Sequence, residues 1–173
     1  MRRFEIQTDR LLIKPLGPEY LDSTNEYAMN LENTKYMMYL PNDTSDETKM
    51  FLKNVEIEWS KENPSFYEFA LIFKKKHIGG VSVYIEDGAG EIGWIINRKY
   101  WRKGFAYEAA KAVIDYFAKN LGFTHFTAHC DTENTASFKL MEKLGMVRTG
   151  ENGTRKNRSA QKESAEYQYE LKL

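Results

Sequence analysis

The sequence predicts a mixed α+β fold in which about four helices flank a central, mostly antiparallel sheet. Three consecutive segments, 66–73, 78–85 and 91–96, have the β-branched and aromatic bias of strands, with short polar turns between them. A long segment from Gly104 to Leu121 then places apolar residues at helical spacing. Because no linker interrupts this order, we expect a single domain over residues 1–173.

Composition and charge exclude several classes of protein. The chain has 25 basic and 25 acidic side chains, so no overall field favours nucleic acid or an anionic membrane as a partner. No apolar run approaches the roughly 18 residues of a membrane span. The N-terminus lacks the apolar stretch of a secretory signal, and Cys130 is the only cysteine, so we expect a cytoplasmic protein.

The first part of the chain predicts one strand and two helices. Leu11, Leu12, Ile13 and Leu16 are apolar and run into a Gly-Pro turn, as a strand does. Residues 19–31 show helical spacing after Pro18. A second helix should begin at Thr44 or Ser45, with acidic residues in its first turn, and end before Pro64.

The three central strands should form an antiparallel meander. Lysines 74–76 suit the turn between the first two strands, and residues 87–90 suit the turn before the third. The helix from Gly104 should end at Gly122. A strand over 124–130, a helix over 135–144 and two strands near Met146 and Tyr167 complete the order, and the polar segment 150–163 is predicted to be a mobile loop.

The segment NRKYWRKGFAYEAA joins the third meander strand to the long helix and has the features of an anion site. The first N–H groups of a helix have no partner inside the helix and lie at the positive end of its dipole. Gly104 allows a close backbone approach, and the neighbouring basic side chains are Arg98, Lys99, Arg102 and Lys103. The alternative is a basic loop that binds nothing. The phosphate motifs of P-loop enzymes and of dinucleotide folds are both missing from the sequence.

At these residues the chain resembles the GNAT superfamily of acetyltransferases, in the branch of the ribosomal-protein N-terminal acetyltransferases RimJ and RimL. The likeness runs from TDRLLIKPL through FALIFKKKHIGGVSV to the segment that begins EIGWIINRKYWRKGFAYEAA and ends EKLGMVRTG. The superfamily's cofactor loop is Q/R-x-x-G-x-G/A, and Trp101 to Ala106 occupy it here, with Trp101 a departure that is frequent in the branch.

The resemblance implies that the chain binds acetyl-CoA in a sheet splayed at the cofactor strand. Pantetheine would pair with the backbone of that strand, the diphosphate would bind the N–H groups of the loop, and an asparagine would contact the pantetheine arm. The cofactor-binding residues implied in this way are Trp94, Ile95, Ile96, Arg102, Lys103, Gly104, Phe105, Ala106, Tyr107 and Asn134. Asn134 also suits a helix cap that contacts no ligand.

Two side chains are candidates for the chemistry. Glu91 begins the cofactor strand and could take a proton from an amine directly or through a water, although glutamates at strand edges are usually only solvated. Many family members have a tyrosine as acid where this chain has Met141, so the resemblance assigns Ser137 to the leaving thiolate. The alternative for Ser137 is a bond to the backbone of its own helix.

The predicted activity is transfer of an acetyl group to a primary amine, either the α-amine of a protein N-terminus or a small-molecule amine. The resemblance places the acceptor groove at Tyr36, Met37, Met38, Tyr39, Trp59 and Tyr84. A different reading is an acyl-CoA sensor with a degenerate site, because the tyrosine is missing. Cys130 and His129 should lie on opposite faces of a strand, the histidines lack metal-ligand spacing, and the chain could be a monomer or a homodimer.

Overall fold

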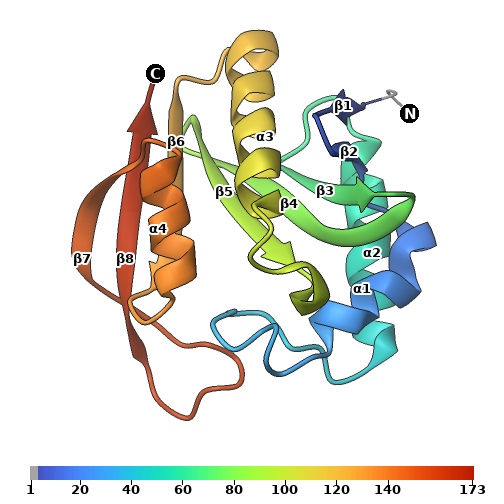
Figure 1. Cartoon of the computed structure of the whole chain (residues 1–173), viewed down its shortest axis with the longest axis horizontal. Helices are drawn as coiled ribbons and strands as arrows, with labels where there is room; N and C mark the ends of the chain where they lie inside the picture. Colours follow the sequence, from blue (N-terminus) through green and yellow to red (C-terminus); the bar gives the residue numbers. More distant parts are fainter. Residues whose placement is uncertain (1–3) are drawn as a thin grey trace.

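The computed structural model describes residues 4–173, in which eight strands form one sheet in the order β1-β2-β3-β4-β5-β6-β8-β7 (Figure 1). Every neighbouring pair is antiparallel except β5 and β6, which run parallel. The strand bounds are β1 (Ile6–Gln7), β2 (Leu11–Pro15), β3 (Phe66–Phe73), β4 (Lys76–Glu86), β5 (Ala89–Ile96), β6 (His125–Asp131), β7 (Val147–Arg155) and β8 (Ser164–Lys172). The predicted α+β class and the antiparallel meander are confirmed, and β1 is an addition to the prediction.

The four α-helices are close to those predicted. They are α1 (Leu21–Ala28), α2 (Ser45–Trp59), α3 (Phe105–Leu121) and α4 (Thr135–Lys143), and short 3₁₀ turns precede α1 and α3. Helix α1 ends three residues before the predicted Leu31, because Asn30 closes a turn there: its side chain accepts from the N–H of Asn33 and its carbonyl accepts from Thr34.

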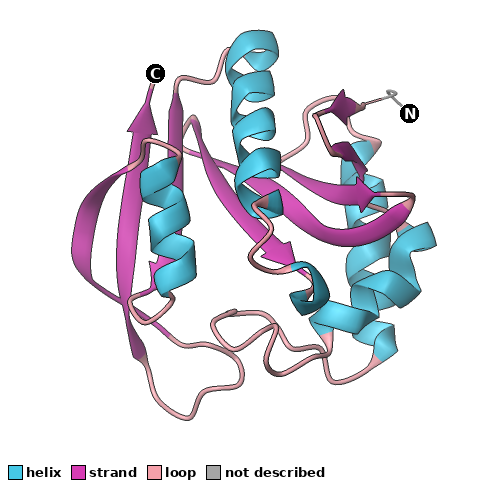
Figure 2. Cartoon of the chain, viewed as in Figure 1, coloured by secondary structure: helices cyan, strands magenta, loops and turns pink. Residues whose placement is uncertain are grey.

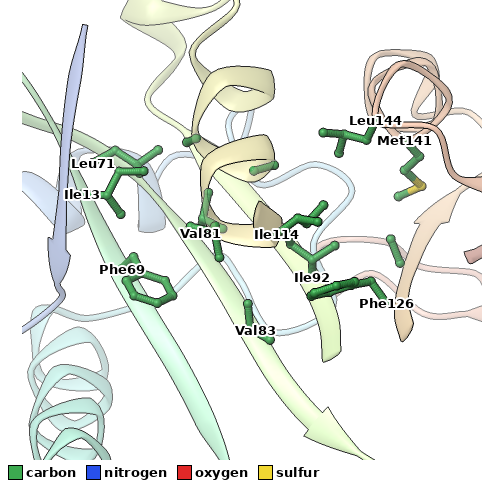
Figure 3. Packing of buried hydrophobic residues seen from close by; sticks show 14 of the residues in the cluster. Ile13, Phe69, Leu71, Val81, Val83, Ile92, Ile114, Phe126, Met141 and Leu144 are labelled. Atoms are coloured by element: carbon green, nitrogen blue, oxygen red, sulfur yellow. The ribbon is translucent and has the colours of Figure 1, made fainter. Parts of the chain in front are cut away.

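The helices cover both faces of the sheet (Figure 2). Helix α2 packs Leu52 and Val55 against Leu16 and Ala70 on one face, where α1 also lies. Helices α3 and α4 pack on the other face. There Ile92 of β5 and Phe126 of β6 meet Ile114 of α3, while Met141 of α4 fills the core beside them (Figure 3).

Met141, which stands where many family members have a tyrosine, is buried. Its side chain is 1% exposed in the main core, so the residue that replaces the family's tyrosine packs the interior. The position therefore contributes to stability and presents no acid to a substrate.

The prediction of a mobile loop over residues 150–163 is wrong for residues 150–155, while residues 156–163 do form a loop between β7 and β8. Residues 150–155 belong to β7 and pair with β8, across two bulges. Strand β7 lies at the edge of the sheet with most side chains in solvent, so its sequence shows no apolar alternation. The rest of the segment is tied to α2 and to the chain before it through Arg158, which donates to the carbonyl of Met37 and to the carboxylates of Asp43 and Glu47.

Candidate functional site

Strands β5 and β6 separate soon after they meet. Only two residue pairs join them, Gly90 with Phe126 and Glu91 with Thr127, although β5 continues to Ile96 and β6 to Asp131. The remaining halves of the two strands diverge and leave a gap in the sheet (Figure 1). This is the splay that the resemblance implies at the expected cofactor strand.

The backbone of β5 presents hydrogen-bonding groups to this gap. In the ladder with β4, the N–H of Asn97 donates to the carbonyl of Ile78. Such bonds alternate along an antiparallel pair. The main-chain N–H and C=O groups of Ile95 therefore point toward β4, and those of Trp94 and Ile96 point toward the gap. Among the three strand residues predicted to bind cofactor, only Trp94 and Ile96 thus offer main-chain groups to the gap.

Trp101 has a role that sequence reasoning left open. Its indole Nε1 donates to the carbonyl of Ile96 at 2.7 Å, and the Asn33 side chain donates to the same carbonyl at 2.9 Å. The tryptophan that departs from the superfamily loop therefore ties that loop to the end of β5.

The start of α3 lies beside the end of β5. Arg102 and Gly104 have positive φ angles of 61° and 78°, so the loop turns sharply into the helix. Within residues 4–173, no backbone or side-chain acceptor receives the N–H groups of Arg102 to Tyr107. Six donors at a helix start are therefore open to an anion, and the side chains of Arg102 and Lys103 are exposed next to them.

Residues near the N-terminus hold the loop that precedes α3. Thr8 and Arg10 bond the Glu108 carboxylate at 2.6 Å each, and Arg10 also donates to the carbonyl of Lys103 at 2.8 Å. The Arg10 guanidinium lies 4.4 Å from the centre of the Phe105 ring. These contacts join residues about a hundred positions apart, which no sequence pattern signals.

Asn134 and Ser137 stand at the start of α4, beside the splayed end of β6. The Asn134 side chain caps the helix by accepting from the N–H of Ser137 at 3.3 Å. Its capping role is thus present in the structure, and its amide nitrogen makes no bond within the described residues. The Ser137 hydroxyl is half-buried and is likewise without a partner there.

Glu91 lies where β5 and β6 part, and it is paired. Its Oε1 is 3.2 Å from Nδ1 of His129 on β6. The hydrogen bond from His129 lowers the pKa of Glu91, and the bond to Glu91 raises the pKa of His129. His129 therefore faces Glu91, while its neighbour Cys130 is buried on the other face of β6, where burial raises the pKa of its thiol to about 11.

The predicted acceptor groove is only partly assembled. Met38 and Tyr39 are exposed on the chain between α1 and α2, and Tyr84 is exposed on β4. Trp59 does not belong to the groove, because it packs against Tyr67 and Phe69 in the core and donates its indole N–H to a backbone carbonyl. No helix in residues 4–173 is long and apolar enough to cross a membrane, and no cluster of side chains in that range has the make-up of a metal site.

The chain matches known acetyltransferases. Residues 10–147 match the model of the acetyltransferase (GNAT) domain. The uncharacterized N-acetyltransferase YnaD of Bacillus subtilis (strain 168) is 30% identical over 151 residues, which cover 84% of each chain.

Two solved structures share the fold. The RimL ribosomal α-N-protein acetyltransferase in complex with coenzyme A has a TM-score of 0.83, with 13% identity over 98% of both chains. The spermidine N-acetyltransferase of Vibrio cholerae, in complex with CoA and spermine, has a TM-score of 0.81 and 20% identity over 95% of this chain and 96% of that one. The family model and YnaD together show that this chain belongs to the GNAT family and is an acetyltransferase that uses acetyl-CoA.

Proposed function

We propose that this enzyme transfers the acetyl group of acetyl-CoA to a primary amine, by direct attack of the amine within a ternary complex. The observation that carries the proposal is the continuity between the β5–β6 gap and the six open N–H groups at the start of α3. An extended arm that ends in a diphosphate matches that combination of a slot and an anion site.

In this arrangement the diphosphate binds the N–H groups of Arg102 to Tyr107. The pantetheine arm follows β5 away from α3 and bonds the main chain of Trp94 and Ile96. From Ile96 back to Ile92 the strand is about 13 Å long, so the thioester lies near the point where β5 and β6 meet. Asn134 contacts the arm from the opposite wall of the gap.

The chemistry then needs an oxyanion donor and a partner for the leaving thiolate. A main-chain N–H of β5, that of Trp94 or Ile96, stabilises the developing oxyanion, and one such donor contributes about 3 kcal/mol. The Ser137 hydroxyl donates to the departing thiolate, which needs little more because its pKa is about 8.5. Glu91 stands close to the thioester but is bound to His129.

The acceptor is either the α-amine of a protein N-terminus or the amine of a small molecule. One neighbour of this fold acts on a ribosomal protein and another is bound to spermine, and both acceptors present a primary amine. The exposed Met38, Tyr39 and Tyr84 would line the entry of such an amine.

The test is an acceptor screen that follows release of the CoA thiol. Purified protein is offered acetyl-CoA with peptides of varied N-termini, polyamines, aminoglycosides and amino-acid analogues. Thiol release that depends on one of these amines supports the proposal. Tight binding of acetyl-CoA without thiol release from any amine would instead favour a cofactor sensor, and a failure to bind CoA would exclude both.

A further inference from the structure

The carboxyl group of Glu68, unlike that of Glu91, has no histidine partner within residues 4–173. Glu68 lies on β3, on the sheet face that α1 and α2 cover, and its direct partner on β4 is Ser82. Ser82 is in turn the partner of Gly93 on β5. Glu68, Ser82 and Gly93 therefore form one row across the sheet, which ends at the first part of β5 that is free of β6.

The residues that separate Glu68 from the gap in this row are small, namely Ser82 and Gly93. Gly93 has no side chain, and a Cβ at that position would lie 3.0 Å from the Ser82 hydroxyl. Neighbouring strands are about 4.8 Å apart, so the backbone of Glu68 is about 10 Å from that of Gly93. Glu68 and Gly93 therefore face the same side of the sheet with only the strand that carries Ser82 between them.

The Glu68 carboxyl group has one partner. The Tyr84 hydroxyl donates to Oε1 at 2.9 Å, and Oε2 makes no hydrogen bond within residues 4–173. No lysine, arginine or histidine of the described chain forms an ion pair with it. The backbone of Glu68 is fixed, because its carbonyl accepts from Nε1 of Trp59 and from the N–H of Leu16.

A partly buried carboxyl group without an ion-pair partner is costly for the folded protein and is a frequent mark of a functional site. Burial raises the pKa of Glu68 to about 7, while the bond from Tyr84 acts in the opposite direction. The other ionisable groups on this face include Tyr27 of α1, His77 of β4, Tyr39 of the chain between α1 and α2, Glu91 of β5 and His129 of β6. Both histidines have other partners: His77 contacts Ser23 and the carbonyl of Gly79, and His129 contacts Glu91.

Glu91 is a weaker candidate for the same task. Its pKa is lowered by His129, and a carboxylate that is already paired has little tendency to accept a proton at neutral pH. A base that titrates near the working pH exchanges protons more effectively.

We propose that Glu68, oriented by the Tyr84 hydroxyl, binds the ammonium group of the acceptor and takes its proton before the amine attacks the thioester. This inference rests on the proposed function, and it selects acceptors whose amine arrives as a cation. Glu68 is the catalytic residue and Tyr84 the positioning residue.

The protons balance in three steps. Glu68 takes one proton from the ammonium group, and the free amine forms the new C–N bond while the thioester carbonyl becomes an oxyanion. The C–S bond then breaks, and CoA leaves as a thiolate. The thiolate receives the second amine proton, Glu68 returns the first to water, and the products are the amide and CoA thiol.

The experiment measures kcat/KM for the acceptor against pH in three variants, together with calorimetric affinity for CoA. The wild type should lose activity below about pH 7, as the base becomes protonated. Glu68→Gln keeps the shape and accepts from Tyr84, and should lower kcat/KM by about 100-fold or more with CoA affinity unchanged. Tyr84→Phe removes a hydrogen bond that lowers the pKa of Glu68. The loss of kcat/KM at low pH should therefore set in at a higher pH in this variant than in the wild type. Glu86→Gln, an exposed glutamate at the end of β4, should behave as wild type.

Activity and a pH profile that survive Glu68→Gln in a folded protein would overturn the inference and leave the proposed function intact. If the wild type acetylates no amine, the Glu68 carboxyl carbon is followed by NMR while propylamine is added. A pKa of Glu68 that falls on addition supports the ammonium site even though the proposed function has failed. A pKa that does not move overturns the ammonium site as well.

Discussion

Nδ1 of His129 lies 3.2 Å from Oε1 of Glu91, and Glu91 belongs to the last residue pair that joins β5 to β6. The pair bridges the two strands at the point where the sheet opens. Two titratable side chains therefore lie at the opening of the gap.

The pair should make stability depend on pH in a defined window. The pKa of His129 is raised, so its contribution is present below its usual value of 6.5 and is lost as pH rises through the folded-state pKa. The pKa of Glu91 is lowered, so its contribution is present above the usual 4.5 and is lost as pH falls. The stabilisation is therefore greatest between these two values.

Because both side chains are partly exposed, His129→Gln should cost only about 0.2 to 1 kcal/mol, and only inside that window. Urea unfolding at about pH 5.5 and about pH 8.5 measures the difference between wild type and variant. An equal loss at both pH values would mean that the histidine acts through packing and not through its charge.

The glycines at the two ends of α3 offer a matched pair of substitutions. Gly104 and Gly122 have φ angles of 78° and 74°, so alanine at either position should cost about 1 kcal/mol of stability. Only Gly104→Ala should also weaken CoA binding, by about tenfold, because its methyl group and altered loop disturb the phosphate site. Calorimetry on both variants checks this, and equal CoA affinities would count against the loop as the binding site.

Asn134 combines a structural and a proposed binding role, and two variants separate them. Asn134→Ala removes the cap of α4 and should destabilise the protein by about 1 kcal/mol. Asn134→Asp can still cap the helix but has lost the amide donor, so it should keep stability and bind CoA less tightly. Thermal unfolding and calorimetry distinguish the two effects. If the aspartate variant binds CoA as well as wild type does, Asn134 is only a cap.

Ser137→Ala should lower kcat by about tenfold while the affinity for CoA stays the same, because the hydroxyl is assigned to the leaving thiolate. Ser137→Thr keeps a hydroxyl and should recover most of the rate. Steady-state kinetics with the best acceptor of the screen measures both. An unaltered rate in the alanine variant would remove Ser137 from the mechanism.

The fold and the bounds of α3 were predictable because their signals are local. Gly104 and Gly122 mark the two ends of α3 within the sequence of the helix itself, and both have left-handed backbone angles in the structure. The meander strands likewise carry their own residue bias and turn residues.

What the sequence left undetermined depends on contacts between distant segments. Arg10 reaches Glu108 from 98 positions away, and Tyr84 reaches Glu68 only because the β3–β4 register places them together. Strand β7 is stabilised by its pairing with β8 and not by any apolar pattern of its own. Such relationships follow from topology, so no local pattern could identify them.

The most direct test of the account is an amide NMR titration of the ¹⁵N-labelled protein with coenzyme A. The account predicts that the largest shift changes fall on the N–H groups of Arg102 to Tyr107, which have no acceptor in the described structure, and on those of Trp94 and Ile96 along the gap. Saturable binding that leaves the amides of Arg102 to Tyr107 unshifted would contradict it.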